Sequence, residues 1–484
     1  MSVITDDPDY QQTAALDELR HREYARLDAT GQVYLDYTGA GLHAESQIRE
    51  HLARITGVVL GNPHSVSLAS AASTDLVERA RRAVLRFFNA DPAEYTAIFT
   101  ANCSGALKLV GESFPFDAGS RFLLTTDNHN SVNGVREFAH AAGAAVDYVP
   151  LTTPDLRIDL AALERQLGTS DRQQQKLFAY PAQSNFSGVK HPLSLVEQAQ
   201  QAGWTVLLDA AAFVPTSRLD LSAVRPEFVT LSFYKMFGYP TGIGCLIAKR
   251  ASLRLLHRPW YAGGTVNFAT VQGRYHLLSP DEAGFEDGTL NYLNIPAVEI
   301  GLDHMQRVGL DTITRRVMCL TRHLLTALLE LRHSNGRPMV RIYGPATTEM
   351  RGGTVTLNGY DPDGHLLDYR RIEELAGERG ISLRTGCFCN PGAGETAEGI
   401  TESDMRAAAD AGLGMTLPRF VQLMADRRTG KSIGAIRVSL GIVSTAADIE
   451  RFLEFLGSLR DQPRLALGNV TFDIESCRVI RDGS

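Results

Sequence analysis

Long hydrophobic runs, basic tracts and abundant cysteines are all missing from this 484-residue sequence. No apolar run reaches the roughly 20 residues that a membrane-spanning helix needs, so we expect no membrane partner. The first nine residues are acidic and have no apolar core, so we expect no secretory signal peptide. The cytoplasm is therefore the expected location.

Charge and cysteine content argue against two further classes of protein. The formal net charge is −7, lysine and arginine are scattered, and no basic stripe with interleaved aromatics occurs, which argues against a nucleic-acid partner. Six cysteines in so long a chain do not make a secreted disulfide framework. Cys387 and Cys389 are too close for the usual zinc pair and no second pair exists, so no metal site is predicted.

The sequence does contain a regular alternation of strand-like and helix-like segments. Its strand-like runs include Tyr34–Asp36, Ile98–Thr100, Phe122–Thr125, Leu177–Tyr180, Val206–Asp209 and Cys245–Ala248. This alternation predicts an α/β fold with a mostly parallel sheet covered by helices on both faces. The chain is long enough for two cores. We predict a large domain over residues 1–325 and a smaller α+β domain over 326–484, with the segment 1–45 packing on the smaller one.

Lys235 has an unusual setting, Ser-Phe-Tyr-Lys-Met-Phe-Gly-Tyr-Pro-Thr-Gly, after a short apolar run. The aromatic neighbours Phe233, Tyr234 and Phe237 would favour a neutral amine that can condense with an aldehyde. The natural partner is the aldehyde cofactor pyridoxal 5'-phosphate. A lone lysine of this kind is more often a surface residue whose stem lies on aromatics.

Asp209 ends a buried-type strand run, Trp-Thr-Val-Leu-Leu-Asp, upstream of Lys235. Open α/β sheets place ligand groups at this position. A carboxylate there would keep the cofactor's pyridine nitrogen protonated and make the ring an electron sink. A strand-end aspartate is otherwise a turn or capping residue.

Three polar segments offer further binding groups. Cys103 and Ser104 stand where a strand run meets a helix pattern, so their N–H groups would bind a phosphate, to which Ser232 could add a hydroxyl. His129, in an Asp-Asn-His loop, could stack on a pyridine ring, and Asn185, in Ser-Asn-Phe-Ser-Gly, could donate to its phenolic oxygen. Each also has a plain interpretation as a capping, surface or turn residue.

In this order the motifs resemble the class V aminotransferase family of fold-type I pyridoxal phosphate enzymes, which includes cysteine desulfurases and isopenicillin N epimerase. The motifs are Thr-Ala-Asn-Cys-Ser-Gly-Ala-Leu, Asp-Asn-His, Ser-Asn-Phe-Ser-Gly, Leu-Leu-Asp-Ala-Ala and Ser-Phe-Tyr-Lys. Within the family, Gly-Asn-Pro-His-Ser, Phe-Glu-Asp-Gly-Thr and Leu-Arg-Thr-Gly-Cys-Phe-Cys-Asn-Pro-Gly-Ala most resemble the desulfurase domain of molybdenum cofactor sulfurases. The resemblance extends from about Tyr34 to near Arg437.

The resemblance implies roles for these residues. It implies that Lys235 binds the cofactor covalently, Asp209 pairs with the pyridine nitrogen, His129 stacks on the ring, Asn185 contacts the phenolic oxygen, and Cys103, Ser104 and Ser232 hold the phosphate. It also implies that Thr289 reaches the phosphate of a neighbouring subunit, which predicts a homodimer. Arg437 would bind the substrate carboxylate as a fork, and Arg384 is the second predicted substrate-binding residue. The plain alternatives are a turn residue at Thr289 and an edge-strand surface charge at Arg437.

Cys387 and Cys389 bear on the substrate. In the desulfurase pattern Arg-x-Gly-x-x-Cys the cysteine attacks the substrate sulfur, and here this spacing runs from Arg384 to Cys389. A nearby arginine and free loop N–H groups favour the nucleophilic thiolate, so the resemblance predicts a persulfide on Cys389 and release of alanine. A disulfide, a metal site or idle thiols are the alternatives.

Departures from the family pattern leave the reaction open. Gly394 stands where molybdenum cofactor sulfurases usually have another cysteine, and Tyr234 and Ala212 replace a histidine and a glutamine of many desulfurases. We predict C–S cleavage of cysteine or a cysteine-derived amino acid by a desulfurase or sulfurtransferase, with an unidentified sulfur acceptor. The alternatives are a β-lyase acting on a cysteine S-conjugate, in which Cys389 is dispensable, an epimerase or aminotransferase, and a non-catalytic binding protein.

Overall fold

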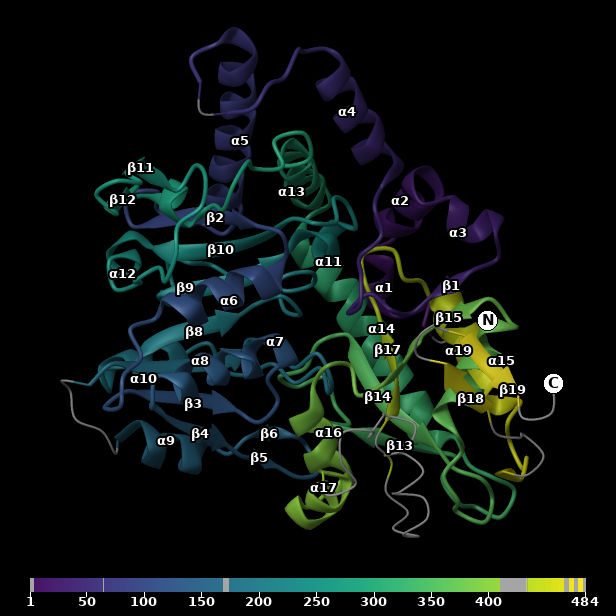
Figure 1. The fold of residues 1–484 in the computed structure, drawn as a ribbon. Helices are drawn as coiled ribbons and strands as arrows, with labels where there is room; N and C mark the ends of the chain where they lie inside the picture. The colour runs from purple at the N-terminus through teal and green to yellow at the C-terminus, as the bar shows by residue number, and fades with distance from the viewer. Residues whose placement is uncertain are drawn as a thin grey trace.

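The computed structural model describes residues 4–63, 65–168, 174–409, 432, 434–464, 470–473 and 478–481. At its centre lies a seven-stranded sheet in the order β2-β10-β9-β8-β7-β3-β4 (Figure 1). Its strands are β2 (Tyr95–Thr100), β3 (Arg121–Thr125), β4 (Ala145–Val149), β7 (Lys176–Pro181), β8 (Thr205–Asp209), β9 (Phe228–Ser232) and β10 (Gly244–Lys249). All neighbours are parallel except the two pairs that β10 makes. The predicted α/β fold with a mostly parallel sheet is confirmed.

Helices cover both faces of this sheet because successive strand side chains point to opposite sides. On β3, Phe122 and Leu124 belong to the same core as α6 (Cys103–Ser113) and α8 (Val135–Ala141), whereas Leu123 belongs to the opposite core. The opposite core includes side chains of α5 (Leu68–Phe87), α9 (Leu160–Gly168), α10 (Leu195–Gln201) and α13 (Pro296–Val308). The sheet is thus buried on both sides, as the apolar strand runs predict.

A second sheet, of four antiparallel strands, lies in the C-terminal half in the order β13-β14-β17-β16. Its strands are β13 (Val340–Tyr343), β14 (Thr354–Gly359), β16 (Arg384–Gly386) and β17 (Ala435–Ser439). The helices α14 (Leu310–Glu330) and α15 (Tyr369–Gly377) contact this sheet, and α19 (Ala446–Gly457) packs on α14. The domain boundary predicted at residues 325 and 326 falls within α14, and the division into domains stays a prediction.

The N-terminal segment lies beside the C-terminal elements, where purple meets yellow in Figure 1. It comprises α1 (Pro8–Gln11), α2 (Ala15–Glu23) and α3 (Arg26–Ala29). Arg20 donates to Asp448 at 2.6 Å and to the Val443 carbonyl at 2.9 Å. The guanidinium of Arg316 lies 3.8 Å from the centre of the Tyr10 ring. Buried charged groups with several partners hold the N-terminal segment against α14 and the start of α19.

The expected strand at Tyr34–Asp36 forms outside the central sheet. The strand β1 (Val33–Tyr34) pairs in parallel with β15 (Ile381–Ser382). The next residues continue this pairing, since the Ser439 N–H donates to the Leu35 carbonyl at 2.7 Å. Asp36 is thereby carried to the C-terminal sheet, which a local sequence pattern does not reveal.

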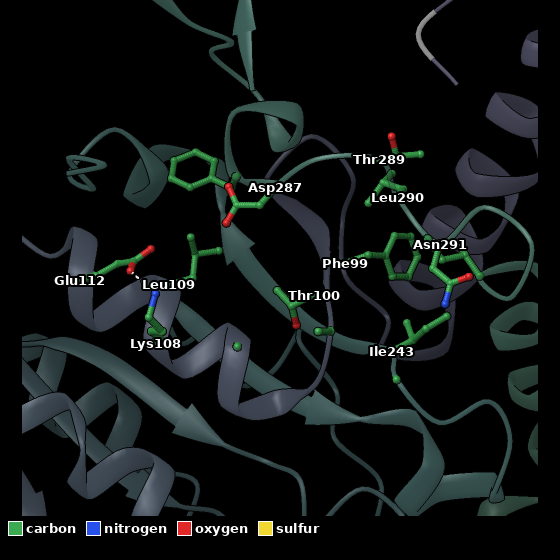
Figure 2. Close-up of a pocket in the computed structure, with 15 residues that line it drawn as sticks. Phe99, Thr100, Lys108, Leu109, Glu112, Ile243, Asp287, Thr289, Leu290 and Asn291 are labelled. Carbon is green, nitrogen blue, oxygen red and sulfur yellow. Dashed lines mark hydrogen bonds and ion pairs between the residues drawn. The ribbon is translucent and has the colours of Figure 1, made fainter. Parts of the chain in front are cut away.

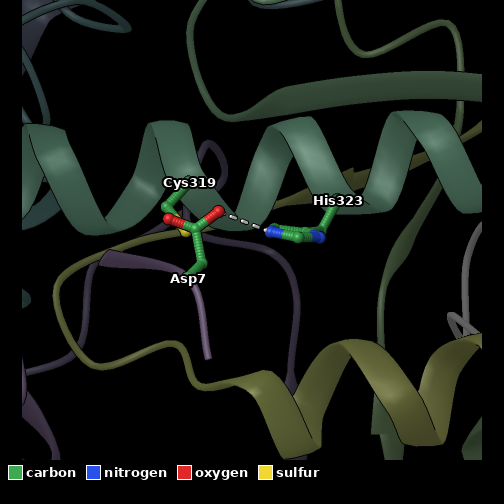
Figure 3. Close-up of side chains that lie close together, drawn as sticks. All are labelled: Asp7, Cys319 and His323. Carbon is green, nitrogen blue, oxygen red and sulfur yellow. Dashed lines mark hydrogen bonds and ion pairs between the residues drawn. The ribbon is translucent and has the colours of Figure 1, made fainter. Parts of the chain in front are cut away.

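Asp7, Cys319 and His323 lie together where the N-terminal segment meets α14 (Figure 3). Oδ2 of Asp7 accepts hydrogen bonds from His323 at 2.8 Å and from Arg322 at 2.7 Å, and Oδ1 accepts from the Asp9 N–H at the start of α1. Burial acts to raise the pKa of Asp7, but these bonds hold it well below its usual range. Because both oxygens are engaged and one faces a cation, we assign this cluster to the anchoring of the N-terminal segment.

Shorter elements complete the described part of the chain. They are α4 (Glu45–Thr56), α7 (Asn130–Asn133), α11 (Phe233–Phe237), α12 (Arg250–Leu253), α16 (Pro391–Glu398), α17 (Glu402–Ala409), the 3-10 helix η1 (Glu282–Phe285), and the strands β5 (Leu151–Thr152), β6 (Arg157–Ile158), β11 (Val266–Ala269), β12 (His276–Leu278), β18 (Val470–Asp473) and β19 (Arg478–Arg481). No helix in the whole described part of the chain, the longer ones included, is long and apolar enough to cross a bilayer.

Candidate active site

A cavity of about 360 Å³ lies at the carboxyl ends of the parallel strands. Among the residues that line it are these predicted site residues: Cys103, Ser104, His129, Asn185, Asp209, Ser232 and Lys235. They follow different strands, and parallel strands bring their carboxyl ends to one edge of the sheet. The structure therefore gathers into one space groups that lie more than a hundred residues apart in the sequence.

Lys235 reaches the cavity because β9 runs directly into the short helix α11. Phe233 and Phe237 are buried and stack on each other with ring centres 6.0 Å apart. They do not line the cavity, whereas Tyr234 does, so the expected aromatic enclosure of the amine is largely wrong. Within the described residues, the Lys235 amine has no hydrogen bond or ion pair and is open to a ligand.

The end of α11 explains the glycine after the lysine. Gly238 has φ +77°, a left-handed conformation that suits glycine, and a Cβ there would overlap the backbone of Leu42 and His43. The helix therefore stops one turn after it begins. This sharp turn leaves Lys235 at the sheet edge instead of in a longer helix.

Asp209 lies at the end of β8 and is 9% exposed. Its Oδ1 accepts a hydrogen bond from the Ala211 N–H at 3.0 Å. Its Oδ2 has no hydrogen-bond donor among the described residues, and Asp209 lines the cavity with Lys235. A largely buried carboxylate with a free oxygen can accept a proton-bearing ring nitrogen of a ligand.

The N-terminus of α6 forms the other end of the cavity. Asn102 caps this helix by accepting from the Gly105 N–H at 2.8 Å, and the N–H groups of the first turn lack intrahelical acceptors. Ser104 shares a 2.6 Å hydrogen bond with Ser131. Burial, with the charge of Asp209, raises the pKa of the Cys103 thiol to about 12. Cys103 is therefore a neutral thiol, and this end of the cavity suits an anion.

His129 caps α7 and faces the same cavity. Its Nδ1 accepts from the Ser131 N–H at 3.1 Å, which places the proton of a neutral ring on Nε2. Burial, together with the positive charge of Lys235, lowers the pKa of His129. The neutral imidazole that results is a flat surface suited to stacking on an aromatic ring.

Arg437 lies just behind the cavity wall. It sits on β17, which has neighbours on both sides, so the edge-strand alternative is wrong. Its guanidinium is buried and donates to the Asn185 carbonyl and to Asp36, each at 3.0 Å. Burial lowers the pKa of Arg437, while Asp36 opposes the shift. Its Nε has no partner among the described residues, so one buried donor remains for a ligand.

Asp36 was missed by the sequence analysis. Its Oδ2 accepts from Arg384 Nε and NH2, at 2.9 and 2.6 Å, while its Oδ1 accepts from Arg437. The predicted substrate residues Arg384 and Arg437 thus share one carboxylate. The only sequence signal was the Tyr-Leu-Asp motif before Tyr37, which carries no hint of these partners.

Cys389 lies at the rim and does not line the cavity. It is exposed, and its carbonyl accepts from the Asn130 N–H at 2.7 Å, next to His129. Asn185 donates through Nδ2 to the Phe388 carbonyl at 2.7 Å. The loop that carries the predicted nucleophile is thus bonded to two of the loops that form the cavity.

Thr289 lies apart from the cavity of its own chain. It is exposed, and it lines a separate hollow with Lys108 and Asn291 (Figure 2). The Asn62 side chain donates to its hydroxyl at 3.4 Å. Thr289 therefore does not line the cavity of its own chain that holds Lys235.

Comparison with known proteins identifies related sequences over most of the chain. A family model described as Aminotransferase class-V matches residues 33–452. The chain is 37% identical over 473 residues to molybdenum cofactor sulfurase of Solanum lycopersicum, covering 92% of this chain and 57% of that protein. It is 37% identical over 466 residues to molybdenum cofactor sulfurase of Homo sapiens, covering 91% of this chain and 51% of that protein. The chain therefore spans about half the length of these curated relatives.

Solved structures share the fold. A cysteine desulfurase from Thermococcus onnurineus NA1, in its apo form, matches with a TM-score of 0.74 at 22% identity, covering 91% of this chain and 97% of that one. The cystine C–S lyase C-DES, in complex with its product cysteine persulfide, matches with a TM-score of 0.66 at 19% identity, covering 88% and 97%. The resemblance inferred from the motifs is confirmed by the family match and the curated relatives.

Proposed function

This chain belongs to the class V aminotransferase family, and from that premise we propose that it is a pyridoxal 5'-phosphate enzyme that cleaves the C–S bond of cysteine or a cysteine-derived amino acid. One observation carries the proposal: Lys235, Asp209 and His129 meet the N-terminus of α6 in a single cavity, with Cys389 at its rim. The relatives named molybdenum cofactor sulfurases and the neighbours named cysteine desulfurases support it.

The cavity residues fit a pyridine ring that bears an aldehyde and a phosphate. The unpartnered amine of Lys235 would bind the aldehyde covalently, and the free Oδ2 of Asp209 would accept the proton-bearing ring nitrogen. The first turn of α6, with the hydroxyls of Ser104 and Ser232, would bind the phosphate. His129 in its neutral form would lie against the ring.

Asn185 would orient the cofactor ring, and Arg437 would orient the substrate. The second N–H of the Asn185 amide, beyond the one bonded to Phe388, would reach the phenolic oxygen. The unpartnered Nε of Arg437 would bind the α-carboxylate, and Asp36 holds that guanidinium in place from the other side. One contact would fix the ring and the other the carboxylate, and together they set which bond at the α-carbon can break.

Bound pyridoxal phosphate supplies an electron sink for charge that develops at the substrate α-carbon. The Lys235 amine would remove the substrate α-proton as a general base. Asp209 would accept a hydrogen bond from the ring nitrogen through its free Oδ2. The two residues thus have separate roles, since Lys235 moves the proton and Asp209 stabilises the charge that this leaves.

The sulfur would pass to Cys389. Its thiolate contributes the electron pair of the new S–S bond, the Cβ–S bond of the substrate breaks, and its electron pair remains on the carbon, which takes up a proton. The net change converts one thiol and one cysteine into a persulfide and alanine. An acceptor thiol would regenerate Cys389 in a later exchange.

A β-lyase is the second candidate, and one observation favours it. Cys389 does not line the cavity in this structure, so substrate sulfur could leave by elimination without reaching it. The structural neighbour C-DES is named a cystine C–S lyase, which shows that this fold also supports such chemistry. Elimination would release pyruvate and ammonia in place of alanine.

The product profile tests the proposal. Holoenzyme is incubated separately with cysteine, cystine and a cysteine S-conjugate, and alanine, pyruvate and sulfide are measured. The desulfurase predicts alanine and sulfide from cysteine in the presence of a reducing thiol. Pyruvate from all three substrates without alanine would support the β-lyase. A holoenzyme that turns over none of them and only transaminates or epimerises amino acids would contradict both.

We also infer that the active unit is a homodimer in which Thr289 reaches the phosphate end of the partner subunit's site. Exposed apolar side chains gather near Thr289, and they include Val59, Val66, Leu68, Phe268, Val271, Tyr275 and Leu277. The chain segments next to them adjoin, since one hollow is lined by Asn62, Pro63, Ser65, Ser70, Gly263, Gly264, Gly288 and Thr289. Such a patch supports a protein partner, and a second copy would also bring Thr289 to a site.

The double substitution Val66→Glu and Leu68→Glu is expected to give a monomer with little activity, because it buries two charges in the inferred interface. Light scattering after size exclusion measures the mass, and Leu329→Glu, on an exposed position of α14, is the control that should stay dimeric. Co-expressed Lys235→Ala and Thr289→Ala chains should be more active than either homodimer, since one site of the mixed dimer is intact. A wild-type monomer with full activity would refute the inference.

A further inference from the structure

The loop that carries Cys389 has a backbone that is costly to maintain. Phe388 has φ +56° and Cys389 has φ +55°, and neither is a glycine. Two successive residues with side chains in the left-handed region cost free energy and persist only where surrounding contacts hold them. Cys389 is nevertheless exposed, so packing of its own side chain does not supply these contacts.

Asn390 supplies them. Its side chain is fully buried, and Nδ2 donates to the Asp127 carbonyl at 2.7 Å and to Oδ1 of Asn185 at 2.9 Å. Its Oδ1 accepts from the Ala393 N–H at 3.2 Å and so caps α16. All of the hydrogen-bonding groups of this amide are used, which is the condition under which a buried polar group fixes one arrangement.

The partners of Asn390 lie on the segments that form the cavity. Asp127 lies two residues before His129, and Asn185 lines the cavity. The same two segments bond to the loop a second time, through Asn130 to the Cys389 carbonyl and through Asn185 to the Phe388 carbonyl, each at 2.7 Å. One amide therefore joins three chain segments that are far apart in sequence.

Contacts of Phe388 extend the same unit to the carboxylate-binding side. The guanidinium of Arg437 lies 4.7 Å from the centre of the Phe388 ring, and that ring lies 5.6 Å from the ring of Phe186. Arg437 also donates to the Asn185 carbonyl. The loop is thus in contact with each group that would orient the substrate, and displacing it would break all of these contacts together.

We propose that Asn390 is a positioning residue that docks the Cys389 loop on the cavity and thereby decides whether substrate sulfur is captured by Cys389 or lost by elimination. The proposal rests on the proposed C–S cleavage. With the loop docked, the thiolate is close enough to form the S–S bond as the Cβ–S bond breaks. With the loop released, the same α-proton abstraction by Lys235 expels the sulfur as sulfide, and the remaining three-carbon unit hydrolyses to pyruvate and ammonia.

Two substitutions separate docking from helix capping. Asn390→Asp keeps an oxygen that can cap α16 but replaces the donor that faces the Asp127 carbonyl and Asn185 with an acceptor. Asn390→Ala removes both functions. The control is Asn358→Ala. Asn358 is equally buried, its Nδ2 donates to Tyr343, Glu398 and the Gly434 carbonyl, and it has no hydrogen bond to residues 387–390.

The first readout is amide hydrogen exchange in holoenzyme without substrate. Peptides over residues 127–133 and 386–394 should exchange at least about tenfold faster in both Asn390 variants, because the Asn130 and Asn390 N–H groups lose their acceptors. Exchange in these peptides should stay at the wild-type rate in Asn358→Ala. Wild-type exchange in Asn390→Asp would overturn the docking role, and this result does not depend on any activity.

The second readout is the ratio of alanine to pyruvate formed from cysteine. Misplacing a reacting group by about 1 Å can cost roughly 100-fold, so alanine formation should fall by about that factor in both variants while pyruvate formation rises. Faster exchange with an unchanged product ratio would show that docking does not decide the fate of sulfur. If the wild type forms no alanine, the proposed desulfurase function fails, and the exchange data alone still decide whether Asn390 docks the loop.

Discussion

Replacing Lys235 by alanine is expected to lower C–S cleavage by at least about 10³-fold, because the variant loses both the covalent anchor and the general base. The amine has no competing partner among the described residues and faces Asp209 and His129 across one cavity. The Lys235→Ala variant, after reconstitution with pyridoxal phosphate, should also lack the visible absorbance that borohydride bleaches in the wild type.

The matched control is Lys249→Ala. Lys249 ends β10 and pairs with Glu227 at 2.9 Å, away from the cavity, so its removal should leave both the spectrum and the turnover near wild type. Added methylamine should partly restore proton transfer in Lys235→Ala, since a small amine can enter the vacated space. Full activity and an unchanged spectrum in Lys235→Ala would contradict the account.

Replacing Cys389 by serine is expected to lower alanine formation from cysteine by about 100-fold or more while pyruvate formation persists. The hydroxyl is too weak a nucleophile to take up sulfur, whereas Lys235, Asp209 and the anion site stay intact. The variant should bind the cofactor like wild type and lose only the sulfur-transfer branch. Alanine and pyruvate are measured in the same reaction, and persulfide is trapped by alkylation and located by mass spectrometry.

Cys387→Ser is the control for this variant. Cys387 is half-buried two residues away, and its carbonyl accepts from the Asn390 N–H, so the substitution preserves the backbone contact and removes only a thiol. Alanine formation should be unchanged. Equal loss of alanine in both serine variants, or persulfide found only on Cys387, would contradict the assignment of Cys389 as the sulfur acceptor.

The central sheet and the cavity could be predicted from the sequence because short stretches of sequence indicate both. The apolar runs that form β2, β3, β7, β8 and β10 are short and end in polar motifs. A motif that follows a parallel strand must lie at the carboxyl edge, so Asp209 and Lys235 were expected to be close before any contact was known.

The groups around the substrate could not be predicted because they depend on long-range contacts. Asp36 bonds to Arg384, 348 residues away in sequence, because β1 pairs with β15. Each of these strands has only two residues, which is too short a pattern to predict the pairing. Asn390 reads as an ordinary helix cap, and its bonds to Asp127 and Asn185 appear only when three loops are folded together. The direction of the Phe233 and Phe237 rings was likewise set by the core.

Subunit assembly and cellular location are not indicated by any local sequence motif of this kind. The homodimer with Thr289 at the partner subunit's site and the cytoplasmic location stay predictions, as do the roles of individual site residues. Exposed apolar side chains near Thr289 support the first of these.

Peptide mapping of reconstituted protein after borohydride reduction is the most direct measurement. The account predicts one reduced pyridoxal phosphate group per chain, attached to the side chain of Lys235. In Asp209→Ala this attachment should be absent or require a higher cofactor concentration. Attachment at any other lysine, or none when the folded protein is saturated with the aldehyde, would contradict it.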